Sequence, residues 1–316
     1  MPEAVPRPVV VQSLSRHFGD FIAVDGITLD VRPGEIFGFL GPNGAGKTTT
    51  IKMLTGLLAP TSGEGWVAGL DIRAERRAIK SRIGYMSQRF SLYADLTVRE
   101  NIDLFAGLYG VDGERLEQRR RWILDMAELA GLESRLTAEL PLGWKQRLAL
   151  GCAMVHEPGI LFLDEPTSGV DPVARRRFWD LIDDLSGRGT TVFVSTHYME
   201  EAEYCHRLAL LNRGRLIALD TPAALRARVV EPILEVRTDD APGAVDALLG
   251  ADGVLDAAMF GRALHVTVAD ANTGANVVRR ALSRAGRRVE GITPVEASLE
   301  DVFVSLVRAE GGAVVG

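Results

Sequence analysis

A glycine-rich segment at residues 41–49 constrains what this chain can fold into more than any other feature. It follows an apolar run at 35–40, which predicts a buried strand, and precedes a helical pattern over 49–57. This order of strand, glycine loop and helix is that of a phosphate-binding loop, and the segment fits G-x-x-x-x-G-K-[ST]. It reads Gly41-Pro42-Asn43-Gly44-Ala45-Gly46-Lys47-Thr48-Thr49. The sequence therefore predicts an α/β fold with an anion site at the end of this strand.

The residue types in the segment suit a triphosphate. Glycines let the backbone curl so that successive N–H groups point at one anion, and the helix N-terminus adds its positive dipole end. Lys47 can place its ammonium between the β- and γ-phosphates, and Thr48 can offer its hydroxyl to Mg²⁺. A glycine-rich turn without a ligand is the alternative, which the flanking strand and helix disfavour.

Two carboxylates follow a second apolar run, at 160–163. Asp164 and Glu165 come directly after it. Because the carboxyl ends of parallel strands lie at the same edge as the phosphate loop, we expect Asp164 to bind Mg²⁺, directly or through water. Glu165 is then placed to polarise an attacking water. Two exposed acids at a strand end are the ordinary alternative, and the nearby phosphate loop makes the catalytic interpretation the better one.

Composition sets the class of protein. The chain has 316 residues, enough for two domains, and its 47% hydrophobic and 25% charged residues are typical of a globular protein. The sequence contains no run of about 18 apolar residues, so it predicts no membrane-spanning helix. The net charge of −6 argues against broad nucleic-acid binding. Cys152 and Cys205 lie in apolar or amphipathic stretches and are expected to be free, buried thiols.

The first of two expected domains covers residues 9–230. Its strands alternate with helical segments, which predicts a parallel α/β core after an antiparallel start. The expected strands lie within 8–31 and at 66–68, 83–87, 160–163, 191–195 and 208–211. A helical block at about 90–157 interrupts this core and indicates an inserted helical subdomain. In that block Thr97 and Glu100 form a capping box, which predicts a helix start.

The second expected domain, 231–310, is a small α+β accessory domain. Composition shifts near residue 230, and the remaining segment contains no lysine. Its pattern predicts a βαββαβ order, as in a split-βαβ domain, followed by an amphipathic helix. The expected strands are 233–237, 254–260, 263–268 and 289–295, and the expected helices are 242–249, 274–285 and 298–308.

Several motifs in this order resemble those of the ATP-binding-cassette ATPases, the motor subunits of ABC transporters. The resemblance covers about residues 9–230 and implies a P-loop NTPase core that binds ATP and Mg²⁺. Gln88 matches the glutamine loop, whose side chain reaches Mg²⁺ and the attacking water. Asp164 and Glu165 match the magnesium-binding and catalytic acids.

Three further positions carry the resemblance. Phe18 sits where the family places an aromatic that stacks on adenine. The loop Ser168-Gly169-Val170-Asp171 matches the one that crosses the dimer interface. His197 matches the switch histidine that contacts the γ-phosphate. A lone histidine is more often structural, but this one follows a buried strand and completes the set.

One motif departs from the family. Its signature usually reads L-S-G-G-Q, and here the segment is Leu140-Pro141-Leu142-Gly143-Trp144-Lys145-Gln146-Arg147. Pro141 replaces the serine, so a hydroxyl and an N–H are missing. The N–H groups near Gly143 and Trp144 remain available to an anion at the helix start. The resemblance implies that the signature still closes over ATP with fewer hydrogen bonds; the alternative is that sites built with it are slow.

In this family one ATP is sandwiched between two cassettes arranged head to tail, so a chain with one copy of each motif implies a dimer. Two identical chains are expected, and a pair of different cassettes is the alternative. Transport then requires a separate membrane subunit, which places the chain at the cytoplasmic face of the membrane; residues 1–8 read as a loose leader without a signal peptide. Docking is expected after Gln88, at 89–93 and in the helical block, although these apolar residues equally fit a core.

Finer resemblance is to ABC-2-type exporters such as drug and antibiotic efflux systems. It rests on the variant at 140–147, on the run 195–203, and on the ending Ser298-Leu299-Glu300-Asp301-Val302-Phe303. The resemblance implies that the membrane subunit carries the transported substrate and that this chain does not bind it. Alternatives from other classes are the motor of an importer, a soluble cassette ATPase acting in translation or DNA repair, and a non-catalytic nucleotide-binding scaffold. Intact Lys47, Asp164, Glu165 and His197 argue against the scaffold.

Overall fold

The chain divides into two compact units, residues 1–222 and 223–316, which are described separately. The structure is a computed structural model and describes residues 7–88 and 92–309, so most of the expected leader lies outside it. The division falls in helix α8 (Pro222–Arg226), whereas the sequence placed the boundary near residue 230. Within the described residues, no helix has the length and apolarity needed to cross a membrane.

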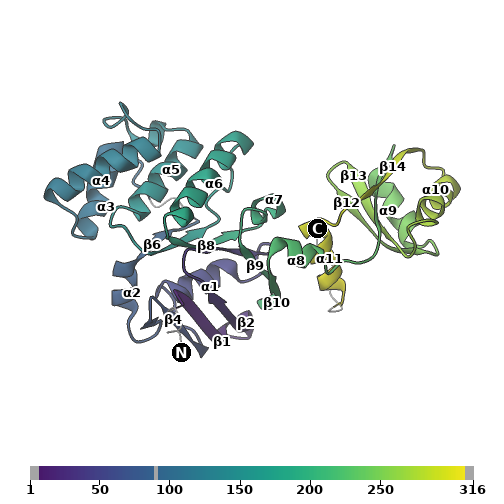
Figure 1. Cartoon of the computed structure of the whole chain (residues 1–316), viewed down its shortest axis with the longest axis horizontal. Coiled ribbons are helices and arrows are strands. Elements are labelled where there is room, and N and C mark those ends of the chain that lie inside the picture. Colours follow the sequence, from purple (N-terminus) through teal and green to yellow (C-terminus); the bar gives the residue numbers. More distant parts are fainter. Residues whose placement is uncertain (1–6, 89–91, 310–316) are drawn as a thin grey trace. The chain divides into compact units, whose positions relative to one another are not determined.

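A six-stranded, mostly parallel sheet forms the centre of the first unit (Figure 1). Its order is β10-β9-β3-β8-β7-β6, with β10 antiparallel to β9 and the other pairs parallel. The strands β3 and β7 are buried at every position, as expected for a sheet covered on both faces. The strand bounds are Ile36–Leu40 (β3), Ile83–Met86 (β6), Ile160–Asp164 (β7), Thr191–Thr196 (β8), Arg207–Asn212 (β9) and Arg215–Asp220 (β10).

Aromatic side chains tie the central strands of this sheet together. The ring centroid of Phe193 in β8 lies 5.0 Å from that of Phe39, 5.4 Å from that of Phe37 and 5.3 Å from that of Phe162. All four rings are fully buried. Tilted rings at these distances favour one packing, so β3, β7 and β8 keep a fixed register.

A second, antiparallel sheet covers the first helix. Its order is β2-β1-β4-β5, and it contains the antiparallel pair that the sequence predicted over 8–31. Helix α1 (Lys47–Leu54) packs between this sheet and the parallel one, with Ile51 and Leu54 in the shared core (Figure 1). The strand bounds are Val9–Phe18 (β1), Phe21–Val31 (β2), Ser62–Val67 (β4) and Leu70–Asp71 (β5).

The remaining helices of the first unit include the predicted helical block. Thr97 caps α3 as expected: its Oγ1 accepts the Glu100 N–H, and its own N–H donates to Glu100 Oε2 at 2.8 Å. Helix α6, which the sequence analysis did not single out, packs on β3 and β8. The bounds are Arg76–Arg82 (α2), Val98–Leu108 (α3), Gly113–Met126 (α4), Thr137–Glu139 (a 3₁₀ turn, η1), Leu142–Ala153 (α5), Pro172–Gly187 (α6) and Met199–Ala202 (α7).

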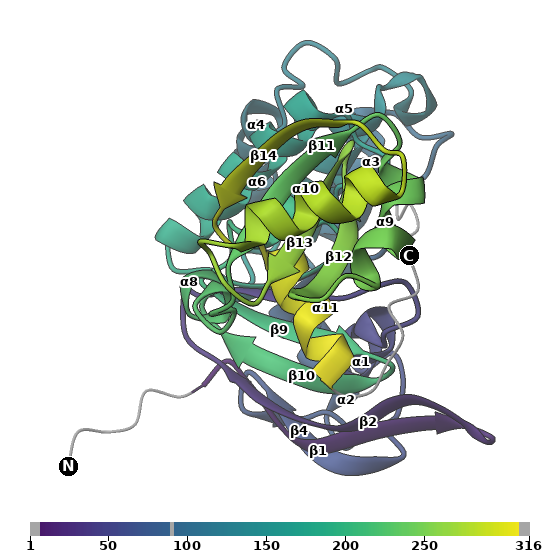
Figure 2. The same ribbon diagram turned by 90° about the vertical axis from the view of Figure 1, so that its right-hand side faces the viewer.

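The second unit has the predicted βαββαβ order. Its antiparallel sheet runs β12-β13-β11-β14 and packs one face on α9 and α10 (Figure 2). On the other face, His265 of β13 bonds to Asp301 of α11. The bounds are Ile233–Thr238 (β11), Ala241–Leu249 (α9), Val254–Phe260 (β12), Ala263–Val268 (β13), Gly274–Arg284 (α10), Val289–Val295 (β14) and Leu299–Ala309 (α11).

Both cysteines are free and buried, as expected from the sequence. Cys205 lies two residues before β9 and against β3, where Gly38 makes room for it: a Cβ on Gly38 would lie 2.6 Å from Cys205 Sγ. Burial raises the pKa of both thiols well above the ordinary value, so neither is a reactive thiolate at neutral pH.

Candidate active site

The glycine loop between β3 and α1 borders a cavity of about 350 Å³. Two of its glycines need a left-handed backbone, Gly44 with φ 81° and Gly46 with φ 103°. A Cβ on Gly46 would also lie 2.6 Å from the Ala23 carbonyl oxygen, so only glycine fits there. The loop amides and the start of α1 line the cavity, which suits an anion. Its lining residues are Phe21, Ala23, Asn43, Gly44, Ala45, Gly46, Lys47, Thr48, Thr49, Gln88 and Glu165.

Lys47 is almost fully buried beside the loop, with 4% of its surface exposed. Its Nζ donates to the carbonyl oxygens of Gly41 at 2.7 Å and Pro42 at 3.2 Å, and it lies 3.2 Å from Glu165 Oε1. Burial lowers the pKa of Lys47, and the nearby Glu165 carboxylate partly opposes that shift. The ammonium is therefore held by the carboxylate and two carbonyl groups at the place where a phosphate would compete for it.

Asp164, at the end of β7, is fully buried, and only one of its two carboxylate oxygens has hydrogen-bond partners in the described residues. Its Oδ1 accepts hydrogen bonds from Ser195 Oγ at 2.7 Å and Thr48 Oγ1 at 3.0 Å, while its Oδ2 has no hydrogen-bond partner in the described residues. Burial raises the pKa of Asp164. A free carboxylate oxygen beside the Thr48 hydroxyl fits a hard cation. The described residues contain no group of three or more His, Cys, Asp or Glu that could hold a metal ion.

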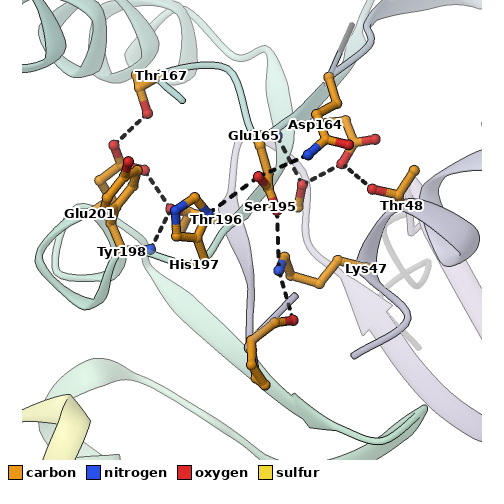
Figure 3. A network of polar contacts seen from close by, with 12 residues as sticks. Lys47, Thr48, Asp164, Glu165, Thr167, Ser195, Thr196, His197, Tyr198 and Glu201 are labelled. Carbon is orange, nitrogen blue, oxygen red and sulfur yellow. Dashed lines mark hydrogen bonds and ion pairs between the residues drawn. The ribbon is translucent and has the colours of Figure 1, made fainter. Parts of the chain in front are cut away.

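Three side chains converge on Glu165, which is 6% exposed (Figure 3). Besides Lys47 at Oε1, Gln88 Nε2 donates to Oε2 at 3.1 Å, and His197 Nδ1 lies 3.2 Å from Oε2 without hydrogen-bond alignment. The backbone of Glu165 has φ 49°, a left-handed conformation that costs energy for a residue with a Cβ. Its N–H donates to both the Ser195 carbonyl oxygen and the Ser195 hydroxyl, which holds this conformation.

The two phenylalanines at the β1–β2 turn differ in their relation to the cavity. Phe21, at the start of β2, lines the cavity and is 63% exposed, whereas Phe18 does not line it. The guanidinium carbon of Arg16 lies 4.4 Å from the centre of the Phe18 ring. The two phenylalanines are paired across the β1–β2 turn, so they are neighbours. Phe21 carried no signal in the sequence, because it belongs to no motif.

The signature segment and Asp171 lie away from the cavity lining in this chain. Pro141 is the residue before α5, and the Trp144 N–H donates to its carbonyl oxygen at 3.1 Å. Gly143 allows α5 to approach α6, since a Cβ there would lie 2.7 Å from Ala174 Cβ. Asp171 caps α6 through hydrogen bonds from the backbone N–H groups of residues 173 and 174. The 168–171 loop adjoins the start of α5, since a Cβ on Gly169 would lie 3.4 Å from Leu142 Cδ2.

A family model described as "ABC transporter" matches residues 24–168. A second, described as "AAA domain, putative AbiEii toxin, Type IV TA system", matches residues 140–201. The Nod factor export ATP-binding protein I of Paraburkholderia xenovorans is 39% identical over 316 residues, which cover 98% of this chain and 99% of that protein. The chain belongs to the ABC transporter family.

A further relative and a solved structure are also similar to the cassette. The probable multidrug ABC transporter ATP-binding protein YbhF of Escherichia coli K12 is 50% identical over 228 residues, 72% of this chain. The match covers 39% of YbhF, so the chain spans less than half of that relative. A dimeric cassette, MJ0796 bound to ADP and Pi, superposes with a TM-score of 0.62 at 27% identity, over 67% of this chain and 98% of that one. These likenesses confirm the predicted fold, an ABC ATPase cassette with a P-loop NTPase core.

Proposed function

We propose that this chain is the ATP-hydrolysing motor subunit of an ABC-2-type export system. It would drive efflux of a drug-like or hydrophobic substrate through a separate membrane subunit. Support comes from relatives named for multidrug transport and Nod factor export, and from the exporter-like segments at 140–147 and 298–303. In this proposal the substrate contacts the membrane subunit, and neither substrate nor nucleic acid binds the cassette.

ATP fits the cavity beside the glycine loop. Its phosphates would lie against the amides of 43–49 and the Lys47 ammonium, with Phe21 or Phe18 against the base. Thr48 and Asp164 would hold Mg²⁺, and the unpartnered Asp164 Oδ2 is the observation that supports this. Gln88 would reach the same ion. When bound, Mg²⁺ supplies positive charge that neutralises the phosphate oxygens.

Hydrolysis would proceed by in-line attack of water on the γ-phosphorus. A bond forms between the water oxygen and phosphorus as the bond from phosphorus to the bridging oxygen breaks, and ADP leaves with that oxygen. Glu165 orients and polarises the water. Its Oε1 becomes free for this once Lys47 turns from the carboxylate to the phosphates. Gln88 and His197, already beside Oε2, would position the water and the γ-phosphate.

The complete site requires a second cassette. In a head-to-tail dimer the amides near Gly143 and Trp144, together with Asp171, would face the ATP of the partner. Pro141 supplies neither a hydroxyl nor an N–H, and the Trp144 amide is bonded within its helix start. The partner's γ-phosphate would therefore meet fewer donors than in a signature with serine at this position. ATP would favour closure by bridging the halves, and loss of the γ-phosphate would weaken it. A dimeric family member supports this arrangement.

The membrane subunit would hold the cassette at the cytoplasmic face of the membrane. Of the docking segment expected at 89–93, residues 89–91 lie outside the described residues. Leu92 is 6% exposed and would belong to the core, whereas Tyr93 is 54% exposed and would be available for docking. Tyr93 is held by Asn101, whose side chain bonds both its N–H and its carbonyl oxygen. The second unit would support dimerisation or regulate the motor.

The convergence of Lys47, Gln88 and His197 on Glu165 is the observation that carries the proposal. Glu165→Gln should still bind MgATP but lose about 10²–10⁴ in turnover, whereas Lys47→Ala should bind nucleotide more weakly. Phosphate release is measured for the purified chain, alone and with its membrane subunit, and the exposed Glu64→Gln serves as a matched control. Normal turnover by Glu165→Gln would overturn the assignment. Export is tested by efflux from a strain that lacks the chain.

A further inference from the structure

A buried carboxylate behind the candidate active site has three partners that the proposed chemistry does not use. Glu201 of α7 is 2% exposed. Its Oε1 accepts a hydrogen bond from Thr167 Oγ1, and its Oε2 accepts one from Thr196 Oγ1 at 2.6 Å (Figure 3). Oε1 also lies 3.3 Å from Arg175 Nε. A buried carboxylate is costly unless it is paired and hydrogen-bonded, and here both oxygens are engaged.

The two hydroxyl partners adjoin the residues proposed to act on ATP. Thr167 lies two residues after Glu165 and directly before the 168–171 loop. Thr196 ends β8 directly before His197, and its Oγ1 also accepts the N–H of Tyr198 at 3.0 Å. One carboxylate therefore joins the backbone that follows Glu165 to the backbone that carries His197.

Arg175 closes the network from α6. Its Nη2 donates to the Val170 carbonyl oxygen at 3.3 Å, inside the 168–171 loop. Its guanidinium carbon also lies 4.0 Å from the centre of the Tyr198 ring, next to His197. The loop proposed to meet the partner cassette and the histidine proposed to meet the γ-phosphate thus share Arg175 and Glu201.

We infer that Glu201 is a positioning residue for ATP hydrolysis, which fixes the His197 segment against the backbone that follows Glu165. The inference rests on the proposed function. Glu201 does not line the nucleotide cavity, so it acts through His197 and the 168–171 loop. Its loss should therefore lower kcat and leave nucleotide affinity unchanged. Because the 168–171 loop is proposed to face the second cassette, Glu201 would also link dimer closure to the position of His197.

Glu201→Gln keeps the shape of the side chain and removes its charge. We expect about tenfold lower kcat, since a small misplacement of a catalytic group has effects of this size or larger, with unchanged affinity for MgATP. Its neighbour Glu200 is exposed, so Glu200→Gln is a matched control that should keep full turnover. Thr167→Val should repeat the loss of kcat without a change of charge, and Thr167→Ser should restore the rate. Phosphate release and nucleotide titration by the purified chain give these values.

A double-mutant cycle with His197 separates positioning from a merely structural role. If Glu201 acts through His197, Glu201→Gln should change kcat by less than about twofold in a His197→Ala background, because residues acting as a unit are not additive. Additive losses overturn the inference and leave the proposed function intact, as does a Glu201→Gln protein with lowered thermal stability but normal kcat. Full kcat in His197→Ala alone instead refutes the proposed role of His197, and the inference with it.

Discussion

Replacing Glu165 by glutamine should tighten the binding of ADP, although it stops hydrolysis. In the structure Glu165 Oε1 lies 3.2 Å from Lys47 Nζ, and both side chains are almost completely buried. A phosphate that enters the loop must therefore displace this carboxylate from the ammonium. Glutamine removes the competing charge, so Lys47 becomes available to the β-phosphate at lower cost.

The size of the effect follows from the geometry of the pair. Two unit charges 3.2 Å apart attract by about 5 kcal/mol at an effective dielectric constant of about 20. Desolvation cancels much of this attraction, and Lys47 keeps its hydrogen bonds to Gly41 and Pro42 in the variant. A net gain of about 1–2 kcal/mol remains, which is about 5- to 30-fold in Kd.

Calorimetric titration of the purified chain with ADP measures this gain directly. ADP is the better probe because it lacks the γ-phosphate, so contacts made only there do not contribute. His197→Ala is the control, since His197 lies beside Glu165 Oε2 and has no contact with Lys47. Burial lowers the pKa of Lys47 and the Glu165 carboxylate raises it, so Lys47 should lose its proton at a lower pH in Glu165→Gln. As the pH is raised, the ADP affinity of this variant should therefore begin to fall at a lower pH than that of the wild type. An ADP affinity equal to or weaker than wild type would refute the competition between carboxylate and phosphate.

Four further perturbations test separate parts of the molecule. His197→Ala should slow phosphate release by about 10²-fold with ATP affinity unchanged; a change confined to ADP affinity contradicts the switch role. Pro141→Ser should strengthen ATP-dependent dimerisation by about 1–3 kcal/mol with a modest change in rate; a large gain in ATPase rate shows instead that the natural signature makes slow sites. Thr97→Ala should lower the free energy of unfolding by about 1 kcal/mol in urea titrations, and Thr97→Ser should not. Burial alone would raise the pKa of Asp301, but hydrogen bonds from His265 and Ser298 lower it below its ordinary value. Its contribution to stability is therefore present above about pH 4 and lost as the pH falls below that value; Asp301→Asn should flatten this part of the stability curve, and an unchanged curve contradicts the assignment.

The sequence predicted those helices, strands and loops whose hydrophobic pattern or motif lies within a single short segment of the chain. Three features are of this kind: the glycine loop, the strand ending in Asp164 and Glu165, and the capping box at Thr97. In each, a hydrophobic pattern that indicates a helix or strand adjoins residues that suit few local structures. Parallel strands then bring the loop and the two acids to one edge, which follows from topology and not from contact information. The βαββαβ pattern of the second unit was equally local, because its strands alternate and its helices are amphipathic.

Contacts between distant segments were outside the reach of such patterns. Glu201 lies in a run of acidic residues, where its neighbour Glu200 is exposed, and nothing in the spacing marks it as the buried one. The left-handed backbone of Glu165 depends on hydrogen bonds to Ser195, a residue on another strand. Phe21 was missed for a related reason: the β1–β2 turn, and not a motif, places it beside the glycine loop.

The burial of Cys152 and Cys205 makes this chain suitable for site-specific labelling at an introduced cysteine. A maleimide dye or nitroxide spin label added to a cysteine introduced on the surface should react there alone, since the native sulfur atoms are shielded and protonated. Opening and closing of the proposed cassette dimer can then be followed by energy transfer or by dipolar distance measurement.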